Sequence, residues 1–303
     1  MPVIQVENLR KVYGDVVAVD NVSFQVNEGE IFGMVGPNGA GKTTTIECIE
    51  GLRRPDGGDV HTLDLNPQTD GYALRERIGV QPQESALSDR VRVWEALDLY
   101  ASFYRRSVDL NSLMEQLGLT EKSKAYFDKL SGGQKQRLSI ALALVNDPEL
   151  IFLDELTTGL DPQARRVMWD LVKNVRDKGK TVFLTTHYME EAELLCDRVA
   201  IMDQGRIVAM DTPDNLIRDL GVDTRIVFTI DGDLEMDSLR ALDGVSRVER
   251  SSEHIVVYGQ GETLVGNVVN ALTANGVRLR DLRTEQPTLE DVFLNLTGRE
   301  MRD

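Results

Sequence analysis

The sequence predicts an α/β protein with a small α+β domain at its C-terminal end. Two observations carry this prediction. In residues 31–50 a short apolar strand runs directly into a glycine-rich loop and then into a helix, and strands followed by helices recur after residue 150. Such alternation is typical of a parallel sheet covered by helices. From about Asp223 the order of elements becomes β-α-β-β-α-β, which predicts a small ferredoxin-like domain.

Length and composition fit a globular protein of about two domains, since the chain has 303 residues, of which 41% are hydrophobic and 28% charged. No apolar run approaches the ~18 residues that cross a bilayer. The N-terminus lacks the basic start and apolar stretch of a secretory signal. We therefore expect a protein that stays inside the cell, on the cytoplasmic face of the membrane if another chain holds it there.

The net charge of −16 argues against a nucleic-acid partner, which requires lysine and arginine clustered on one face. Two cysteines, Cys48 and Cys196, are too few and too far apart for a zinc site or a disulfide framework. We interpret both as reduced packing residues.

The N-terminal stretch, residues 2–35, alternates short β-like runs with turns at Gly14 and Gly29. Tyr13 stands just before the first turn. An aromatic residue at a strand end is usually a packing residue. Because a nucleotide loop follows, stacking of Tyr13 on adenine is the better interpretation.

The loop after residue 35 has the spacing G-x-x-x-x-G-K-[ST] of a phosphate-binding loop. Glycine lets the backbone N–H groups wrap closely around an anion, and the following helix directs its positive end to the same place. Lys42 adds a positive charge for the outer phosphates, and the Thr43 hydroxyl can bind Mg²⁺. The candidate nucleotide-binding residues are Tyr13, Gly36, Pro37, Asn38, Gly39, Ala40, Gly41, Lys42, Thr43 and Thr44.

A helical insert is predicted between this loop and the next motif, at about residues 85–145. Gln81 and Gln83 follow a short apolar run. Apolar residues recur at helical spacing in 91–104, and shorter helices are expected at 110–118 and 123–127.

Ser131, followed three residues later by Gln134, forms a capping box that opens an apolar helix to about Val145. Gly132 and Gly133 leave the N–H groups of this helix start uncovered, which makes it a second potential anion site. A capping box alone is a common structural device.

The apolar strand 150–153 ends in Asp154 and Glu155, at the sheet edge where ligands bind. Neighbours on a strand point to opposite sides, so Asp154 can orient Mg²⁺ while Glu155 faces a water molecule. The alternative is a solvated acidic turn, which the phosphate-binding loop makes less favourable.

Asp161 and Pro162 begin a further helix, which Gly179 ends. The next buried strand, 181–187, delivers His187 at its end. Alone, this histidine would be interpreted as structural. A hairpin around Gln204 and Gly205 then closes the first domain.

Together these motifs resemble the ATP-binding subunit of an ABC transporter over about residues 3–220. GPNGAGKTT is similar to the Walker A loop, LSGGQ at 130–134 to the family's signature motif, IFLDE at 151–155 to the Walker B strand and GLD at 159–161 to the D-loop. The resemblance implies a P-loop NTPase fold, in which a RecA-like core carries an antiparallel β subdomain and an α-helical subdomain. It gives a nucleotide-binding domain at 1–222 and an accessory domain at 223–303. The tail TLEDVFLNLTGRE resembles daunorubicin/doxorubicin-resistance exporter ATPases.

The resemblance also implies a mechanism, in which two copies pair head to tail around two Mg-ATP molecules. The partner copy would contact ATP through Ser131, Gly132, Gly133, Gln134 and Asp161. Glu155 would be the general base, with His187 and Lys42 as the other catalytic residues. Thr43, Gln83 and Asp154 would hold the metal, and Gln83 would pass its position to the helical insert, where separate transmembrane permease subunits are expected to dock.

The expected activity is therefore ATP hydrolysis that drives export of a drug-like or lipid-like substrate, without a nucleic-acid partner. The alternative is a soluble ABC-type ATPase that is not coupled to transport. The family usually has proline after the Walker B glutamate. The leucine here, Leu156, should loosen that turn without removing a catalytic group.

Overall fold

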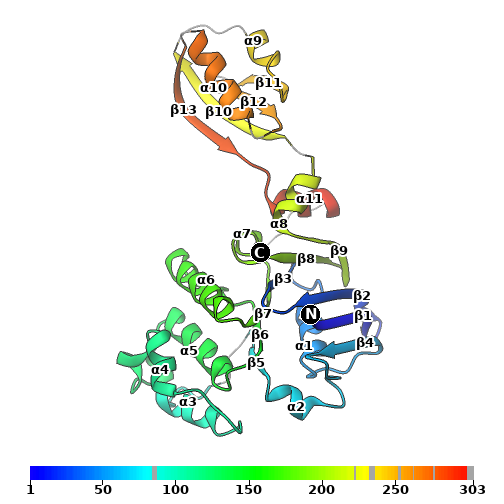
Figure 1. The fold of residues 1–303 in the computed structure, drawn as a ribbon, viewed down its shortest axis with the longest axis vertical. Coiled ribbons are helices and arrows are strands. Elements are labelled where there is room, and N and C mark those ends of the chain that lie inside the picture. Colours follow the sequence, from blue (N-terminus) through cyan, green and yellow to red (C-terminus); the bar gives the residue numbers. More distant parts are fainter. Residues whose placement is uncertain are drawn as a thin grey trace. The chain divides into compact units, whose positions relative to one another are not determined.

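The computed structural model describes residues 1–83, 87–221, 223–231, 236–251, 254–261, 263–275 and 277–298. It divides into two compact units, Met1–Pro213 and Asp214–Gly298 (Figure 1). The division falls earlier than the expected domain boundary at residue 222, which itself lies outside the described residues. It therefore assigns nearly all of helix α8 (Pro213–Asp219) to the second unit.

A six-stranded sheet forms the centre of the first unit, in the order β5-β6-β7-β3-β8-β9. All neighbours are parallel except β8 and β9, which pair antiparallel. The predicted hairpin is confirmed, since Gln204 and Gly205 connect these two strands with φ of 48° and 79°. The strands are β3 (Ile31–Val35), β5 (Ile78–Gln81), β6 (Leu150–Asp154), β7 (Thr181–Thr186), β8 (Arg198–Asp203) and β9 (Arg206–Asp211).

A second, antiparallel sheet has the order β2-β1-β4, from β1 (Pro2–Tyr13), β2 (Val16–Asn27) and β4 (Gly57–Thr62). One hydrophobic core joins it to the central sheet. Phe24 of β2 stacks on Phe32 of β3 with ring centroids 5.4 Å apart, and Phe183 lies 5.5 Å from Phe32 and 5.8 Å from Phe152. This run of rings fixes the strands that carry the candidate site.

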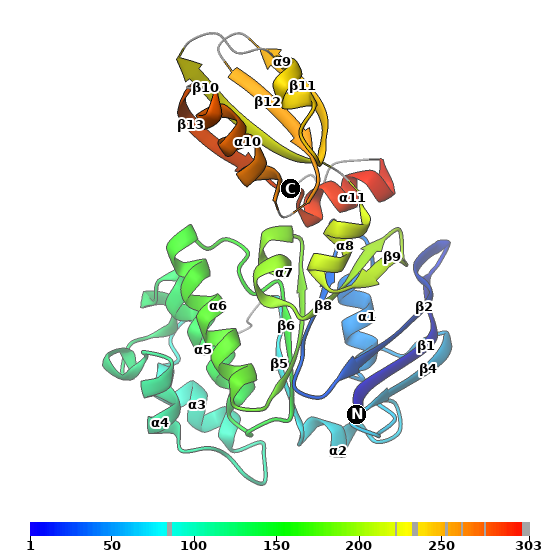
Figure 2. The same cartoon turned by 45° about the horizontal axis from the view of Figure 1, so that its top comes forward.

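The helices of the first unit cover the central sheet and form the predicted insert, in which α3 packs on α4 and α5 (Figure 2). They are α1 (Lys42–Ile49), α2 (Gly71–Arg75), α3 (Val93–Ala101), α4 (Leu110–Gln116), α5 (Gly132–Leu144), α6 (Pro162–Asp177) and α7 (Met189–Leu195). Among the described residues, no helix combines the length and the apolar character that a membrane span needs.

One predicted helix is wrong. Residues 123–125 form a turn, Tyr126 pairs with Arg92 in an isolated bridge, and two short 3-10 helices flank this segment, at Thr120–Lys122 and Phe127–Lys129. The buried Phe127 ring anchors the second one, so tertiary packing overrides the weak local pattern. The capping box of Ser131 and Gln134 at the start of α5 is confirmed.

The second unit contains the predicted β-α-β-β-α-β order. Its sheet runs β11-β12-β10-β13, with antiparallel neighbours throughout. Its core includes Phe228, Leu239 and Val268, so α9 and α10 pack on one face of the sheet. The elements are β10 (Thr224–Asp231), α9 (Met236–Arg240), β11 (Val245–Ser251), β12 (His254–Gly259), α10 (Leu264–Ala274), β13 (Arg278–Glu285) and α11 (Leu289–Thr297). The predicted fold class is confirmed.

Candidate active site

The order of the central sheet brings the sequence motifs together. β6, β7 and β3 are neighbours, and their carboxyl ends lead into Asp154 and Glu155, His187 and the loop 36–43 respectively. Gln83 follows β5, the next strand along. Parallel strands end at one edge of a sheet, which is where ligands bind in such folds.

The phosphate-binding loop is held by close backbone contacts. Gly36 has φ of 156°, and a Cβ there would lie 2.1 Å from the Met202 carbonyl oxygen. Gly41 has φ of 103°, and a Cβ there would lie 2.3 Å from the Ala18 carbonyl oxygen. Only glycine fits both positions without a shift of the backbone. Asn38 and Gly39 are exposed at the tip of the loop.

Lys42 begins α1 and is buried behind the loop. Its Nζ donates to the carbonyl oxygens of Gly36 (2.8 Å) and Pro37 (3.2 Å) and lies 3.8 Å from Glu155 Oε1. Burial lowers the pKa of the Lys42 ammonium, and the Glu155 and Asp154 carboxylates oppose that shift. The ammonium is thus held where the loop would place the outer phosphates.

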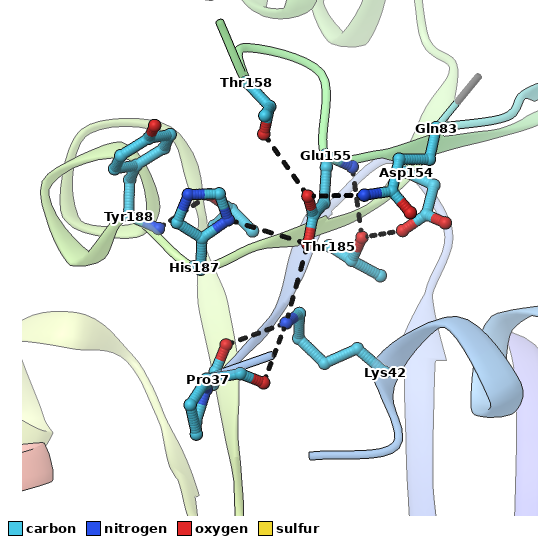
Figure 3. A network of polar contacts seen from close by, with 11 residues as sticks. Pro37, Lys42, Gln83, Asp154, Glu155, Thr158, Thr185, His187 and Tyr188 are labelled. Atoms are coloured by element: carbon cyan, nitrogen blue, oxygen red, sulfur yellow. Dashed lines mark hydrogen bonds and ion pairs between the residues drawn. The ribbon is translucent and has the colours of Figure 1, made fainter. Parts of the chain in front are cut away.

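Glu155 is the centre of the site (Figure 3). Gln83 Nε2 donates to its Oε2 at 2.9 Å, Thr158 Oγ1 lies 3.3 Å from the same oxygen, and His187 Nδ1 lies 3.6 Å from Oε1. β6 ends at Asp154, and Glu155 has a left-handed φ of 50°. The expected alternation of two strand neighbours is therefore wrong in detail: a backbone turn, not strand geometry, directs the Glu155 carboxylate.

Asp154 is 6% exposed and accepts a hydrogen bond from the Thr185 hydroxyl. Burial raises the pKa of this carboxyl, while hydrogen bonds from Thr185 and Thr43 oppose the rise. Asp154 and the Thr43 hydroxyl are thus close together. No group of three His, Cys, Asp or Glu side chains that could hold a metal is found in the part of the chain that the structure describes. One carboxylate with one hydroxyl fits Mg²⁺, which takes its other ligands from phosphate and water.

His187 lies beyond the end of β7, next to Tyr188. Its Nδ1 is buried and has no hydrogen-bond partner among the described residues. The Tyr188 ring lies 4.1 Å from the imidazole between centroids, and the Tyr188 backbone N–H donates to Thr186 Oγ1 at 2.9 Å. The histidine therefore faces Glu155 with one nitrogen unengaged.

The second candidate anion site forms its own cavity of 340 Å³, lined by Ser131, Gly132, Gly133 and Asp161 among others. None of the residues 36–43 lines it. Ser131 Oγ accepts from the Gln134 N–H, and Gln134 Oε1 accepts from the Ser131 N–H. Asp161 caps α6, accepting from the N–H groups of Gln163 and Ala164. Two helix starts and a glycine-rich turn thus meet around one cavity.

Tyr13 ends β1 and is 40% exposed. The Arg53 guanidinium lies 5.3 Å and Lys11 Nζ 5.4 Å from its ring centroid. Adenine stacking on Tyr13 remains a prediction.

Sequence reasoning missed four residues around the site, Thr158, Arg165, Thr185 and Tyr188. Thr185 had a usable signal, because a hydroxyl in a buried strand needs a hydrogen-bond partner. Thr158, Arg165 and Tyr188 gave none, since their contacts depend on the turn after β6 and on the packing of α6 beside β7.

Comparison with known proteins places this arrangement in context. A family model described as ABC transporter matches residues 19–158. The linearmycin resistance ATP-binding protein LnrL of Bacillus subtilis is 38% identical, with 99% of this chain and 100% of that protein covered. The Nod factor export ATP-binding protein I of Ralstonia nicotianae is 39% identical over 100% of this chain and 96% of its own length.

Solved structures give the same result. The structure of an ATP-binding subunit of an ABC transporter is 29% identical with a TM-score of 0.66, covering 72% of this chain and 93% of its own. A dimeric bacterial ABC transporter cassette is 28% identical with a TM-score of 0.62, covering 69% of this chain and 98% of its own.

Proposed function

Because the chain belongs to the ATP-binding proteins of the ABC transporter family, which hydrolyse ATP to power transport, we propose that it is the motor subunit of an exporter. Two copies bind two Mg-ATP head to tail and drive separate transmembrane subunits. The observation that carries this proposal is the meeting of Lys42, Gln83 and His187 around the Glu155 carboxylate, beside a phosphate-binding loop.

The proposed reaction is attack of a water molecule on the γ-phosphorus of ATP. Glu155 takes the proton of that water while the bond from the γ-phosphorus to the bridging oxygen breaks and ADP leaves. His187, whose imidazole lies near Glu155 Oε1, orients the water and the γ-phosphate. Lys42 and the loop N–H groups offset the charge that develops on the phosphate oxygens. Thr43, Asp154 and Gln83 would hold Mg²⁺, which supplies further charge neutralisation.

The dimer explains the second cavity. Ser131, Gly132 and Gly133 lie at the N-terminal end of α5, where uncovered N–H groups favour an anion. In a head-to-tail pair, these three residues would contact the γ-phosphate bound by the partner copy, together with Gln134 and Asp161. The dimeric cassette among the structural neighbours supports this arrangement.

An exposed apolar groove supports the proposed membrane partner. Tyr72, Phe103 and Leu52 are 75%, 64% and 63% exposed and line a cavity of 390 Å³ between the central sheet and the helical insert. Exposed aromatic groups gathered around a hollow are typical of a protein interface. We propose that a segment of the transmembrane subunit occupies this groove. A movement of Gln83 on ATP binding would be passed on to that segment.

The export direction and a drug-like or lipid-like cargo are proposed from the names of the relatives, which concern linearmycin resistance and Nod factor export. The second candidate, a soluble ATPase that is not coupled to transport, is less favoured, because the exposed groove would then have no occupant.

The test is Glu155→Gln, which keeps the size of the side chain but removes its basicity. The variant should bind ATP, lose hydrolysis by at least about a hundredfold and accumulate as a dimer on a sizing column with Mg-ATP. Glu28→Gln, at an exposed turn, is the matched control and should behave as wild type. A Glu155→Gln protein that still turns over ATP would refute the base assignment, and one that stays monomeric would refute the shared site.

A further inference from the structure

A cation and an aromatic ring pack together beside the site without taking part in the proposed chemistry. The Arg165 guanidinium carbon, on α6, lies 4.1 Å from the centroid of the Tyr188 ring, which belongs to the segment between β7 and α7. Both residues are half-buried. An arginine stacked on an aromatic face and partly shielded from water is a favourable and directional contact.

On one side this pair is joined to residues 156–161, the turn that follows Glu155. Arg165 Nε donates to the Leu160 carbonyl oxygen at 3.3 Å. The Arg165 backbone N–H donates to the Asp161 carbonyl oxygen at 3.0 Å. The Leu160 N–H in turn donates to the Thr157 carbonyl at 3.1 Å. The position of the guanidinium therefore follows the position of this turn.

On the other side the pair is joined to His187. The rings of His187 and Tyr188 lie 4.1 Å apart at an angle of 45°. No hydrogen bond to a described residue fixes His187 Nδ1. Besides Glu155 Oε1, 3.6 Å from Nδ1, the neighbouring tyrosine ring is a contact that restrains the direction in which the imidazole faces Glu155 (Figure 3).

We propose that Arg165 and Tyr188 form a positioning pair that holds His187 toward Glu155 and ties this orientation to the turn 156–161. The inference rests on the proposed function, in which His187 orients the attacking water and the γ-phosphate. Asp161, at the end of the same turn, is proposed to contact the partner's nucleotide. Closure of the dimer would thus reach His187 of the same chain through the Leu160 carbonyl, the guanidinium and the tyrosine ring.

The experiment measures kcat and KM for Mg-ATP on the full chain carrying Arg165→Met, Tyr188→Leu or both. Each single variant should lower kcat about tenfold, which is a modest loss for a group that acts through another residue. KM should stay near the wild-type value, because neither side chain lies in the phosphate-binding loop. The double variant should lose no more than Tyr188→Leu alone, since Arg165 acts on His187 only through the Tyr188 ring.

Conservative variants separate positioning from a general loss of structure. Tyr188→Phe keeps the ring and should keep the wild-type kcat, whereas Arg165→Lys keeps the charge but not the planar stack and should resemble Arg165→Met. Arg166→Met, at an exposed neighbouring position on α6, is the matched control. Thermal unfolding identifies a variant that fails to fold, and the Phe and Lys variants then decide the question.

Several results would overturn the pair: wild-type kcat in the single variants, multiplied losses in the double variant, equal losses in Tyr188→Phe and Tyr188→Leu, or wild-type kcat in Arg165→Lys. The Glu155→Gln variant distinguishes the two levels of failure. If it retains hydrolysis, the proposed site itself is wrong. If it is inactive while the Arg165 and Tyr188 variants are fully active, only the positioning pair is wrong.

Discussion

At the scale of single residues, burial decides the behaviour of several charged groups. Glu50, which directly follows α1, is only 5% exposed and lines the same apolar groove as Tyr72. No hydrogen bond or ion pair joins its carboxyl group to another described side chain. Burial, together with the nearby Asp154 and Glu47 carboxylates, raises its pKa from 4.5 to about 8. We therefore expect Glu50 to be largely protonated at neutral pH.

This shift predicts how stability depends on pH. Between 4.5 and about 8 the folded state keeps the proton of Glu50 and the unfolded state releases it. The contribution of Glu50 protonation to the stability of the folded state is therefore fully present below pH 4.5 and is lost as the pH rises through about 8. The free energy of unfolding should fall by about 1.4 kcal/mol per pH unit across this window, before other groups are counted.

Glu50→Gln removes the titrating carboxyl group. The unfolding free energy of this variant should therefore change less with pH than that of the wild type. Denaturant unfolding followed by tryptophan fluorescence measures it, because both tryptophans, Trp94 and Trp169, lie in the first unit. The exposed Glu28→Gln should keep the wild-type slope. Parallel curves for Glu50→Gln and wild type would contradict the assigned protonation.

Residue spacing predicted which side chains meet at the site but not how they are oriented. The motif at 36–43 and the strand ends at Asp154 and His187 were sufficient to bring these groups to one edge. The left-handed backbone of Glu155 was not predictable, since a non-glycine residue rarely adopts it. Leu156 offers a similar lesson. Its side chain is buried, which the sequence did not indicate, while the looser turn expected in place of proline stays a prediction.

At the scale of elements, the strands, the long helices and the short helix predicted at 110–118 followed from their patterns, while the one predicted at 123–127 did not. The capping box at Ser131 and the proline at 162 marked the starts of α5 and α6 correctly. The segment 123–127 failed, because one-turn helices are decided by contacts such as the burial of Phe127.

Packing between β5 and α5 gives a sharp test at this scale. A Cβ at Gly79 would lie 1.9 Å from the Ala143 carbonyl oxygen and 3.0 Å from Pro148 Cγ. Gly79→Ala must therefore separate the strand from the helix, and we expect a loss of about 3 kcal/mol in the free energy of unfolding. Denaturant titration measures it.

Gly71→Ala is the control for this substitution, because the nearest atom to its new Cβ is Arg75 Nη2 at 3.7 Å, an ordinary contact. Its stability should be unchanged or slightly raised, since alanine favours helix α2. Equal stabilities for the two variants would mean that β5 and α5 are packed less closely than described.

At the scale of the whole molecule, the chain is divided into two units with separate cores. The site residues all lie in the first unit. Removing residues 224–303 should therefore leave a folded fragment that binds ATP with near wild-type affinity. Circular dichroism and titration with a fluorescent ATP analogue measure both properties. An insoluble fragment, or one that does not bind nucleotide, would show that the second unit completes the first.

Tyr13 also has a practical consequence. The phosphate-binding loop admits no enlargement, because carbonyl oxygens press on both of its outer glycines, whereas Tyr13 stands at an open turn with free space around Gly14. If the base of ATP stacks on Tyr13, replacing that ring with a smaller side chain would make room for a bulky purine derivative. An inhibitor or an ATP analogue of that kind would act selectively on the substituted protein in a living cell.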